Sequence, residues 1–259
     1  MLVDLHNHTP LCNHAKGEPI EFVQKAIEHN ISVFGFSDHA PMNFDEAYRM
    51  GFDEMDKYEK TVLELKSEYK NQINIKLAYE VDYLPGFIDS RVLDRDVDYL
   101  IGSVHFIGGW GFDNPEFIGD YKGKNPDETW SEYFRLIGDM AKSGHFNIVG
   151  HMDLLKVFNF KPSKDTVKLG RYALDEIKKA GMAIEINASG LRKPVAEQYP
   201  SNELLSAALE LQIPITFGSD AHDPSHIGYK LTDNLQKAKE IGFLEYANFT
   251  ERKMELIKI

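Results

Sequence analysis

The sequence predicts one α/β domain built as a barrel of parallel strands, and three observations support this fold. The chain has 259 residues, close to the roughly 250 residues that one α/β barrel occupies. Short apolar runs alternate with helical patterns along the chain, and such alternation is typical of parallel strands with right-handed crossovers. Polar side chains follow many of the apolar runs, as they do where an α/β fold assembles a site. We expect residues 1–259 to form a single barrel domain.

Seven apolar runs have the length of buried parallel strands. They are Leu2–His8, Ile31–Ser37, Ile75–Val81, Tyr99–His105, Asn147–His151, Ala183–Asn187 and Pro214–Ser219. Seven strands favour a closed barrel over an open sheet.

Three connecting segments carry clear signals for helices. An Asn-Pro pair at Asn125, with Glu128 three residues later, predicts a capped helix start. Ser163 is predicted to open a second helix that ends at Gly181, and Ser201 to open a third.

Residues 107–125, rich in Gly, Asp and Asn, are predicted as a long loop after the fourth strand. Trp110 and Phe112 in this loop would form either part of a lid over the adjacent site or an apolar surface cluster.

Composition excludes several classes of protein. The chain is 42% hydrophobic and 27% charged, which is ordinary for a soluble globular protein and not for a disordered or fibrous one. A net charge of −12 argues against non-specific binding to nucleic acid or to an anionic membrane. No apolar run has the length of a membrane span or a signal peptide. We expect a cytoplasmic protein with a small-molecule partner.

Seven of the ten histidines lie at or just after the C-terminal end of a predicted strand, as do Glu80 and Asp220. The histidines are His6, His8, His14, His39, His105, His151 and His222. Parallel α/β folds assemble active sites at this end of their strands. His29 and His145 are expected to be structural, and the role of His226 stays open.

The spacing of these residues predicts a metal site. His6 and His8 are two residues apart, so on a strand both imidazoles point to one face. Asp220 and His222 repeat that spacing on the last strand. Buried imidazoles need partners, and imidazole with carboxylate suits zinc, iron or manganese. Nine such ligands exceed the need of one ion, so we expect two to three divalent transition metals.

Six motifs in this chain resemble those of the PHP (polymerase and histidinol phosphatase) superfamily. They are Asp4–His8, Ser37–His39, Tyr79–Asp82, Gly102–His105, Gly150–Asp153 and Gly218–His222. The resemblance extends from Val3 to about Gly228, and Glu185–Pro194 further resembles the stand-alone histidinol-phosphatase branch.

The resemblance implies a distorted (β/α)7 barrel with a trinuclear metal site. The first metal would be held by His6, His8, Glu80 and Asp220. The second would share Glu80 as a bridge and be held by His105 and His151. The third would be held by His14, His39 and His222.

Such a site suits the hydrolysis of a phosphomonoester, because clustered metal ions neutralise the phosphoryl oxygens and generate hydroxide from bound water. We expect a metal-bridging hydroxide as the nucleophile and Glu80, Asp220 and His222 as catalytic residues. Asp220 would either hold the water as a ligand or shuttle its proton. Cys12 is not expected to be catalytic.

Residues that bind the substrate are predicted with fewer motifs. Arg192, in a loop after the sixth strand, is predicted to form a bidentate phosphate contact, with a surface arginine as the alternative. Ser189 is predicted to bind the substrate and Lys193 to be solvated. Three aspartates close to ligands, Asp38, Asp82 and Asp153, are predicted to orient imidazoles. Asp153 would alternatively face the amine of the substrate.

The function that the resemblance implies is histidinol-phosphatase activity in histidine biosynthesis, which converts L-histidinol phosphate and water to L-histidinol and phosphate. One alternative is a PHP phosphoesterase for another small phosphate, such as a nucleotide or a phosphotyrosine. Another is a nuclease-type PHP module, against which the net charge of −12 argues. The Glu185–Pro194 signature favours the first of these functions.

Overall fold

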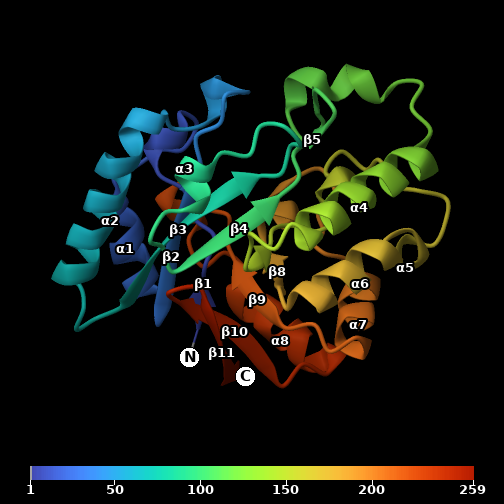
Figure 1. The fold of residues 1–259 in the computed structure, drawn as a ribbon. Helices are drawn as coiled ribbons and strands as arrows, with labels where there is room; N and C mark the ends of the chain where they lie inside the picture. The colour runs from blue at the N-terminus through green and yellow to red at the C-terminus, as the bar shows by residue number, and fades with distance from the viewer. Residues whose placement is uncertain (1) are drawn as a thin grey trace.

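The computed structural model describes residues 2–259 and contains a parallel sheet of seven strands in the order β1-β2-β3-β4-β7-β8-β9 (Figure 1). The strands are β1 (Val3–Asp4), β2 (Val33–His39), β3 (Asn74–Asp82), β4 (Tyr99–Ser103), β7 (Ile148–Val149), β8 (Ala183–Asn187) and β9 (Ile215–Gly218). Each of them overlaps one predicted strand, so the strand predictions are confirmed, although most of the observed strands are shorter.

The first and last strands approach each other and nearly close the sheet into a barrel. The amide of Leu5 donates to the carbonyl of Phe217 at 2.9 Å, and the amide of Asp220 donates to the carbonyl of His6 at 2.7 Å. Asn7 and Ala221 form a parallel bridge just beyond the two strands. The predicted α/β barrel is confirmed, and it brings the end of the first strand beside the end of the last.

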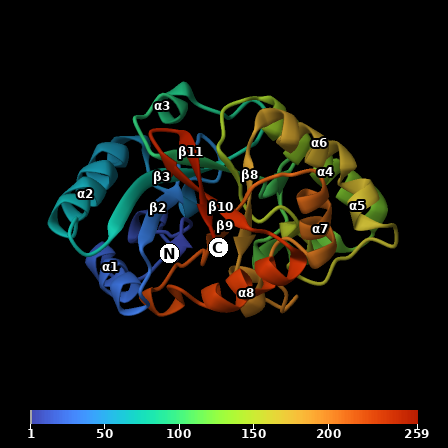
Figure 2. The same ribbon diagram turned by 90° about the horizontal axis from the view of Figure 1, so that it is seen from below.

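Helices surround the strands (Figure 2). The α-helices are α1 (Pro19–Glu28), α2 (Met55–Glu68), α3 (Ser90–Leu93), α4 (Pro126–Lys142), α5 (Thr166–Leu169), α6 (Arg171–Ala180), α7 (Asn202–Glu210) and α8 (Leu231–Ile241). The 3₁₀ helices are η1 (Pro10–Cys12), η2 (Glu46–Tyr48), η3 (Phe52–Glu54), η4 (Pro115–Tyr121), η5 (Leu154–Lys156), η6 (Ser189–Arg192) and η7 (Pro224–His226). Among residues 2–259, none of the helices has the length and apolar character needed to cross a membrane.

The helix predictions are confirmed in part. The side chain of Asn125 accepts from the amide of Asp127 at 3.1 Å and caps α4, as predicted. Ser163 does not open a helix, because its amide and hydroxyl both donate to the carboxylate of Asp127 on α4 at 2.8 Å. The helical segment starts later and is divided at Gly170 into α5 and α6. It ends at Gly181, as predicted.

Two hairpins were not predicted. The segment after β4 contains β5 (Phe106–Ile107) paired with β6 (Trp110–Gly111), followed by η4, where the sequence predicted only a loop. The chain ends in a second hairpin, β10 (Glu245–Thr250) with β11 (Lys253–Lys258). Its backbone accepts a hydrogen bond from Thr216 at the carbonyl of Ala247, at 2.9 Å, so β10 packs against the last barrel strand.

The barrel strands are buried along nearly their whole length, and one hydrophobic cluster extends through the barrel and the inner faces of its helices. Tyr99 ties two strands together, since its hydroxyl donates to the carbonyl of Leu5 at 2.6 Å. The polar side chains at the C-terminal ends of the strands are therefore positioned by a closely packed apolar core.

Candidate metal centre

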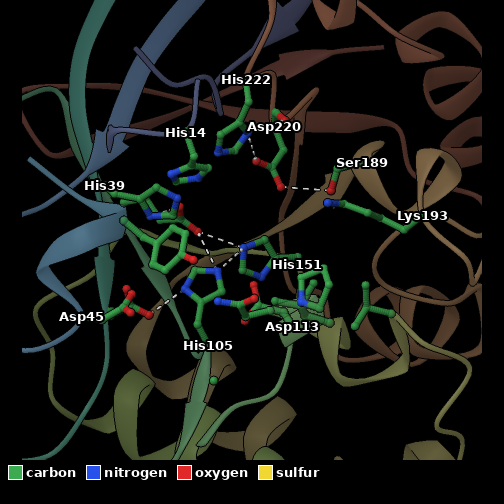
Figure 3. A pocket seen from close by; sticks show the side chains of 18 of the residues that line it. His14, His39, Asp45, His105, Asp113, His151, Ser189, Lys193, Asp220 and His222 are labelled. Carbon is green, nitrogen blue, oxygen red and sulfur yellow. Dashed lines mark hydrogen bonds and ion pairs between the residues drawn. The ribbon is translucent and has the colours of Figure 1, made fainter. Parts of the chain in front are cut away.

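The structure brings the nine predicted metal ligands together at the C-terminal ends of the strands, in and beneath one cavity of about 510 Å³ (Figure 3). Seven of the nine line the cavity: His14, His39, Glu80, His105, His151, Asp220 and His222. His6 and His8 are fully buried beneath it.

Glu80, at the end of β3, lies at the centre of the cluster. Its Oε2 is 3.3 Å from His6 Nε2 and 3.1 Å from His39 Nδ1. Its Oε1 is 2.9 Å from His151 Nε2 and accepts from the hydroxyl of Ser103 at 2.6 Å. The two oxygens of one carboxylate thus face different groups of imidazoles, which is the arrangement expected of a bridging ligand.

Among the described residues, five groups of side chains have ligand atoms within 4.8 Å of one another, and three of these groups together include eight of the nine predicted ligands. The three groups are His6, His8 and Glu80; Glu80, His105 and His151; and His14, His39 and His222. The ninth ligand, Asp220, places Oδ1 3.2 Å from His8 Nε2.

The donor atoms of these groups fit metal ions. Among residues 2–259, His6 Nε2 and His8 Nε2 are buried and make no hydrogen bond of good geometry, although oxygens of Glu80 and Asp220 lie 3.3 and 3.2 Å from them. Such buried nitrogens are costly unless another group binds them. Nε2 of His105 and Nε2 of His151 are only 3.3 Å apart. Divalent transition metals bind such nitrogen and carboxylate donors.

Carboxylates behind the imidazoles hold three of them in place. Asp38 contacts His8 Nδ1 at 3.3 Å and Asp82 contacts His105 Nδ1 at 2.6 Å, as predicted. Glu185 on β8, whose role the sequence analysis missed, contacts His6 Nδ1 at 2.8 Å. It also accepts from the backbone amide of His151 at 3.0 Å. Such contacts orient the opposite ring nitrogen toward a metal.

Asp153 neither orients an imidazole nor lines the cavity. Its Oδ2 lies 2.9 Å from Nζ of the buried Lys156 and accepts from the amide of Ser201 at 2.8 Å. The chain turns sharply at His151, where φ is 24°, and η5 carries Asp153 toward Lys156. The expectation that Asp153 orients an imidazole is therefore corrected, and contact between Asp153 and the amine of the substrate stays a prediction.

Electrostatics favour anionic carboxylates at the centre of this site. Burial by itself would raise the pKa of Glu80, but the imidazoles of His6, His39 and His105 hold that pKa well below its usual range. Burial likewise opposes ionisation of Asp220, and His6, His8 and His222 hold its pKa well below the usual value. The two central carboxylates are therefore anionic.

The imidazoles divide into two sets. Burial lowers the pKa of His39 and of His222 well below the ordinary value, which favours the unprotonated form of each ring that a metal ion needs. Burial also acts to lower the pKa of His8, but Asp220 and Asp38 raise it to about 9. Asp82 and Asp113 similarly overcome burial and raise the pKa of His105 to about 10. A metal ion bound at His8 or His105 would take the place of a proton.

The residues predicted to bind the substrate are placed as follows. Arg192 lines the cavity, and its Nη2 donates to the carbonyls of Ser219 at 2.8 Å and Asp220 at 3.0 Å. Its buried Nη1 has no hydrogen-bond partner in the described part of the chain. Ser189 lines the cavity and donates from its hydroxyl to Asp220 Oδ2 at 3.0 Å. Lys193 is exposed, as predicted, yet it also lines the cavity, as does His226.

The segment after β4 reaches the cavity, but not through the aromatic residues expected to form a lid. Phe106 and Phe117 line the cavity. Phe112 is fully buried and Trp110 packs against Phe112 and Tyr121. Asp113, between these aromatic residues, lines the cavity and was not predicted.

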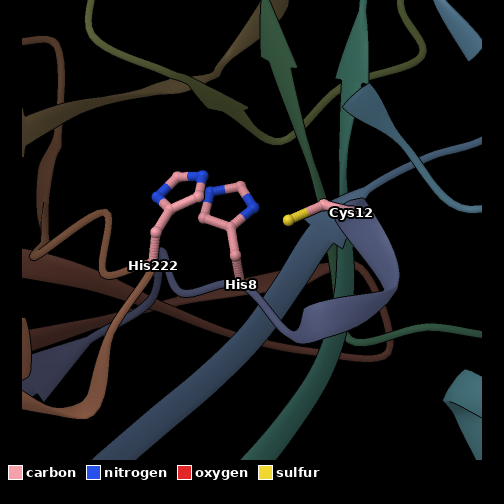
Figure 4. A group of neighbouring side chains, drawn as sticks. All are labelled: His8, Cys12 and His222. Atoms are coloured by element: carbon pink, nitrogen blue, oxygen red, sulfur yellow. The ribbon is translucent and has the colours of Figure 1, made fainter. Parts of the chain in front are cut away.

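Cys12, at the end of η1, is buried with its sulfur within 4.8 Å of ligand nitrogens of His8 and His222 (Figure 4). Burial, together with Asp38, raises the pKa of the thiol. A neutral buried thiol is a poor nucleophile, in agreement with the expectation that Cys12 is not catalytic.

Comparison with known proteins places this site in a family. The model of the PHP domain matches residues 4–189, which contain seven of the nine clustered ligands. The chain belongs to the PHP domain family.

Several relatives extend over nearly the whole chain. A probable histidinol-phosphatase of Deinococcus radiodurans is 38% identical over 98% of both chains. The histidinol-phosphatase of Bacillus subtilis is 30% identical, with 90% of this chain and 98% of that protein covered.

Solved structures show the same fold. A putative histidinol phosphatase from Listeria monocytogenes matches with a TM-score of 0.80 and 25% identity, over 89% of this chain and 99% of the other. The histidinol phosphate phosphatase of Lactococcus lactis, whose structure was determined with zinc, L-histidinol and phosphate, matches with a TM-score of 0.80 and 24% identity, over 98% of both chains.

Proposed function

We propose that this chain is a metal-dependent histidinol-phosphatase, which hydrolyses L-histidinol phosphate to L-histidinol and phosphate. The observation that carries the proposal is Glu80 at the centre of a cluster of imidazoles, below a cavity that Arg192 also lines. Relatives named for this activity, at 38% and 30% identity over nearly the whole chain, support the choice of substrate.

We propose that the cluster holds three metal ions. His6, His8, Glu80 and Asp220 would hold the first; Glu80, His105 and His151 the second; and His14, His39 and His222 the third. The short distances among the donors and the buried nitrogens that make no hydrogen bond of good geometry support these sets. Zinc, manganese and iron all suit such donors. When bound, the ions would supply charge neutralisation for the phosphoryl group and activation of water.

The protein's own residues would orient the reacting groups. Asp220 Oδ2 accepts hydrogen bonds from Ser189 Oγ at 3.0 Å and from the side-chain Nδ2 of Asn187 at 3.2 Å. These contacts leave Oδ1 facing His8 and make Asp220 an oriented acceptor for the proton of the attacking water. We therefore assign Ser189 a positioning role through Asp220 rather than the direct substrate contact expected from the sequence.

Arg192 would bind the phosphate. Its Nη2 is held by two backbone carbonyls, so the guanidinium is fixed in direction, and Nη1 is buried without a hydrogen-bond partner in the described part of the chain. Charge-assisted hydrogen bonds of this kind are the strong ones in proteins. Lys193 adds positive charge at the same side of the cavity.

The direct test is release of phosphate from a panel of phosphomonoesters by the metal-loaded protein, compared through kcat/KM. The panel contains L-histidinol phosphate, p-nitrophenyl phosphate, a nucleoside monophosphate and phosphotyrosine. We expect L-histidinol phosphate to be the best substrate. Equal or faster hydrolysis of another member would reject the proposed substrate and favour a phosphatase with a different one.

A further inference from the structure

The carboxylates that line the cavity differ in whether another side chain of the protein pairs with them. Five carboxylates line it, from Asp45, Glu80, Asp82, Asp113 and Asp220. Glu80 and Asp220 face the imidazole cluster. Asp82 contacts Arg49 at 2.9 Å as well as His105, and Asp45 contacts the same Arg49 at 3.1 Å. Four of the five carboxylates are thus occupied by the protein itself.

Asp113 is the exception. It follows β6 in the segment between β4 and α4, and within residues 2–259 no side chain donates a hydrogen bond to it or forms an ion pair with it. It lies beside His105 and His151 at the wall of the cavity (Figure 3). Among the described residues no lysine or arginine forms an ion pair with this partly buried carboxylate, so the position favours a cation supplied from the cavity.

Of the three lysine and arginine side chains that line the cavity, Arg49 is paired with Asp45 and Asp82, and the other two come from a different part of the barrel. Arg192 belongs to η6 after β8, and Lys193 follows it. Asp113 belongs to the segment after β4, so the phosphate-binding residues and the unpaired carboxylate stand on separate elements. The cavity therefore suits a ligand that is anionic at one end and cationic close by.

We propose that Asp113 binds the ammonium group of the substrate and selects amino-alcohol phosphates over phosphomonoesters without an amine. This inference rests on the proposed function. In L-histidinol phosphate the ammonium group is on the carbon next to the ester methylene. When the phosphate lies at the metal cluster, the ammonium group must lie against the wall beside that cluster, where Asp113 is placed next to His105 and His151. Phe106 and Phe117 of the same segment provide apolar surface further along the cavity.

The test compares two substrates in the metal-loaded parent and in Asp113→Asn. One substrate is L-histidinol phosphate, and the other is 3-(imidazol-4-yl)propyl phosphate, which lacks only the amine and keeps an alkyl leaving group. A hydrogen bond to a charged group corresponds to about tenfold to hundredfold in kcat/KM. We expect kcat/KM of the parent to be higher for L-histidinol phosphate than for the substrate without the amine by such a factor. In Asp113→Asn this difference should disappear, while kcat/KM for the substrate without the amine stays that of the parent. Inhibition by L-histidinol should weaken in the variant, and inhibition by phosphate should not.

Asp120→Asn is the matched control, because Asp120 is an exposed carboxylate in η4 of the same segment. It should leave both rates unchanged. An equal loss on both substrates in Asp113→Asn would overturn the proposal and assign Asp113 to the leaving group instead. A lower metal content in Asp113→Asn would overturn it in favour of a role in metal binding.

Failure of the proposed function would be recognised separately, in the parent. If the parent hydrolyses other phosphomonoesters but not L-histidinol phosphate, the proposed substrate is rejected. The role of Asp113 is then decided by comparing kcat/KM for O-phosphoethanolamine, which carries an amine, with kcat/KM for ethyl phosphate, which does not. Preference for the amine that disappears in Asp113→Asn would support the role of Asp113, and no preference in the parent would reject it.

Discussion

Glu80 connects more of the metal cluster than any other single side chain described above, since its two oxygens contact imidazoles from β1, β2 and β7 or their following loops. We predict that Glu80→Ala loses bound metal and reduces kcat below detection, while the far-ultraviolet circular dichroism stays that of the parent. The fold should persist because the core is apolar. Metal analysis and phosphate release on the same sample check this. Near-parental kcat in Glu80→Ala at saturating metal would contradict a bridging role.

Arg192 makes a separable contribution, because it lines the cavity without contacting an imidazole of the cluster through a hydrogen bond. Arg192→Ala should lose about 1.5–3 kcal/mol of transition-state stabilisation for each phosphate hydrogen bond removed. Arg192→Lys should recover only part of the activity, since an ammonium group cannot reproduce the planar guanidinium contact. Phosphate should inhibit the alanine variant more weakly, at unchanged metal content. Parental kcat/KM together with parental inhibition would show that Arg192 does not bind phosphate.

The metal ligands could be predicted from the sequence because their positions follow a strand rule. Residues two apart in extended chain share a face, and His6 and His8 flank Asn7, which pairs with Ala221 just beyond β1. Glu185 was missed because its role depends on which nitrogen of His6 points away from the cluster, and only the packed structure decides that. The same spacing rule contained a signal, since Glu185 and Asn187 share a face of β8. Asp153 was misplaced because its distance from His151 in sequence says nothing of the turn between them.

At the scale of the elements, β9 approaches its neighbours so closely that only glycine fits at Gly218. A Cβ atom there would lie 2.0 Å from Glu185 Oε1 and 2.6 Å from the Cβ of His6. Gly218→Ala should destabilise the protein by about 1–3 kcal/mol through overpacking, and it should weaken metal binding by displacing Glu185 and His6. Chemical denaturation and metal analysis check both effects.

Gly119→Ala is the control for that variant, because no atom of the described residues lies within 4 Å of a Cβ atom at Gly119. It should behave as the parent in both measurements. Parental stability and metal content in Gly218→Ala would show that β9 and β8 can separate without affecting the cluster.

The strands could be predicted because each is a short apolar run, whereas several helices and hairpins depend on distant contacts. The predicted start at Ser163 was wrong because Asp127, on another helix, takes its amide and hydroxyl. The hairpin of β10 and β11 pairs mainly with itself and packs against β9, so the strand–helix alternation does not predict it. The hairpin of β5 and β6 is too short to produce a pattern.

At the scale of the whole molecule, one hydrophobic cluster links the strands and helices, and we propose that the chain is a single domain. Metal ions that bind only the folded chain stabilise it in proportion to the logarithm of their concentration. We therefore predict one cooperative thermal transition for the metal-loaded protein, which moves to lower temperature after chelation. Calorimetry checks this, and two separate transitions would contradict a single domain.

The central claim is that clustered metal ions in this barrel carry the hydrolysis of L-histidinol phosphate. The most direct measurement prepares metal-free protein and titrates it with manganese or zinc, while bound metal and release of phosphate are recorded on each sample. The account predicts no turnover without metal and activity that reaches its plateau at two to three bound ions per chain. Full activity in metal-free protein, or at no more than one bound ion, would contradict it.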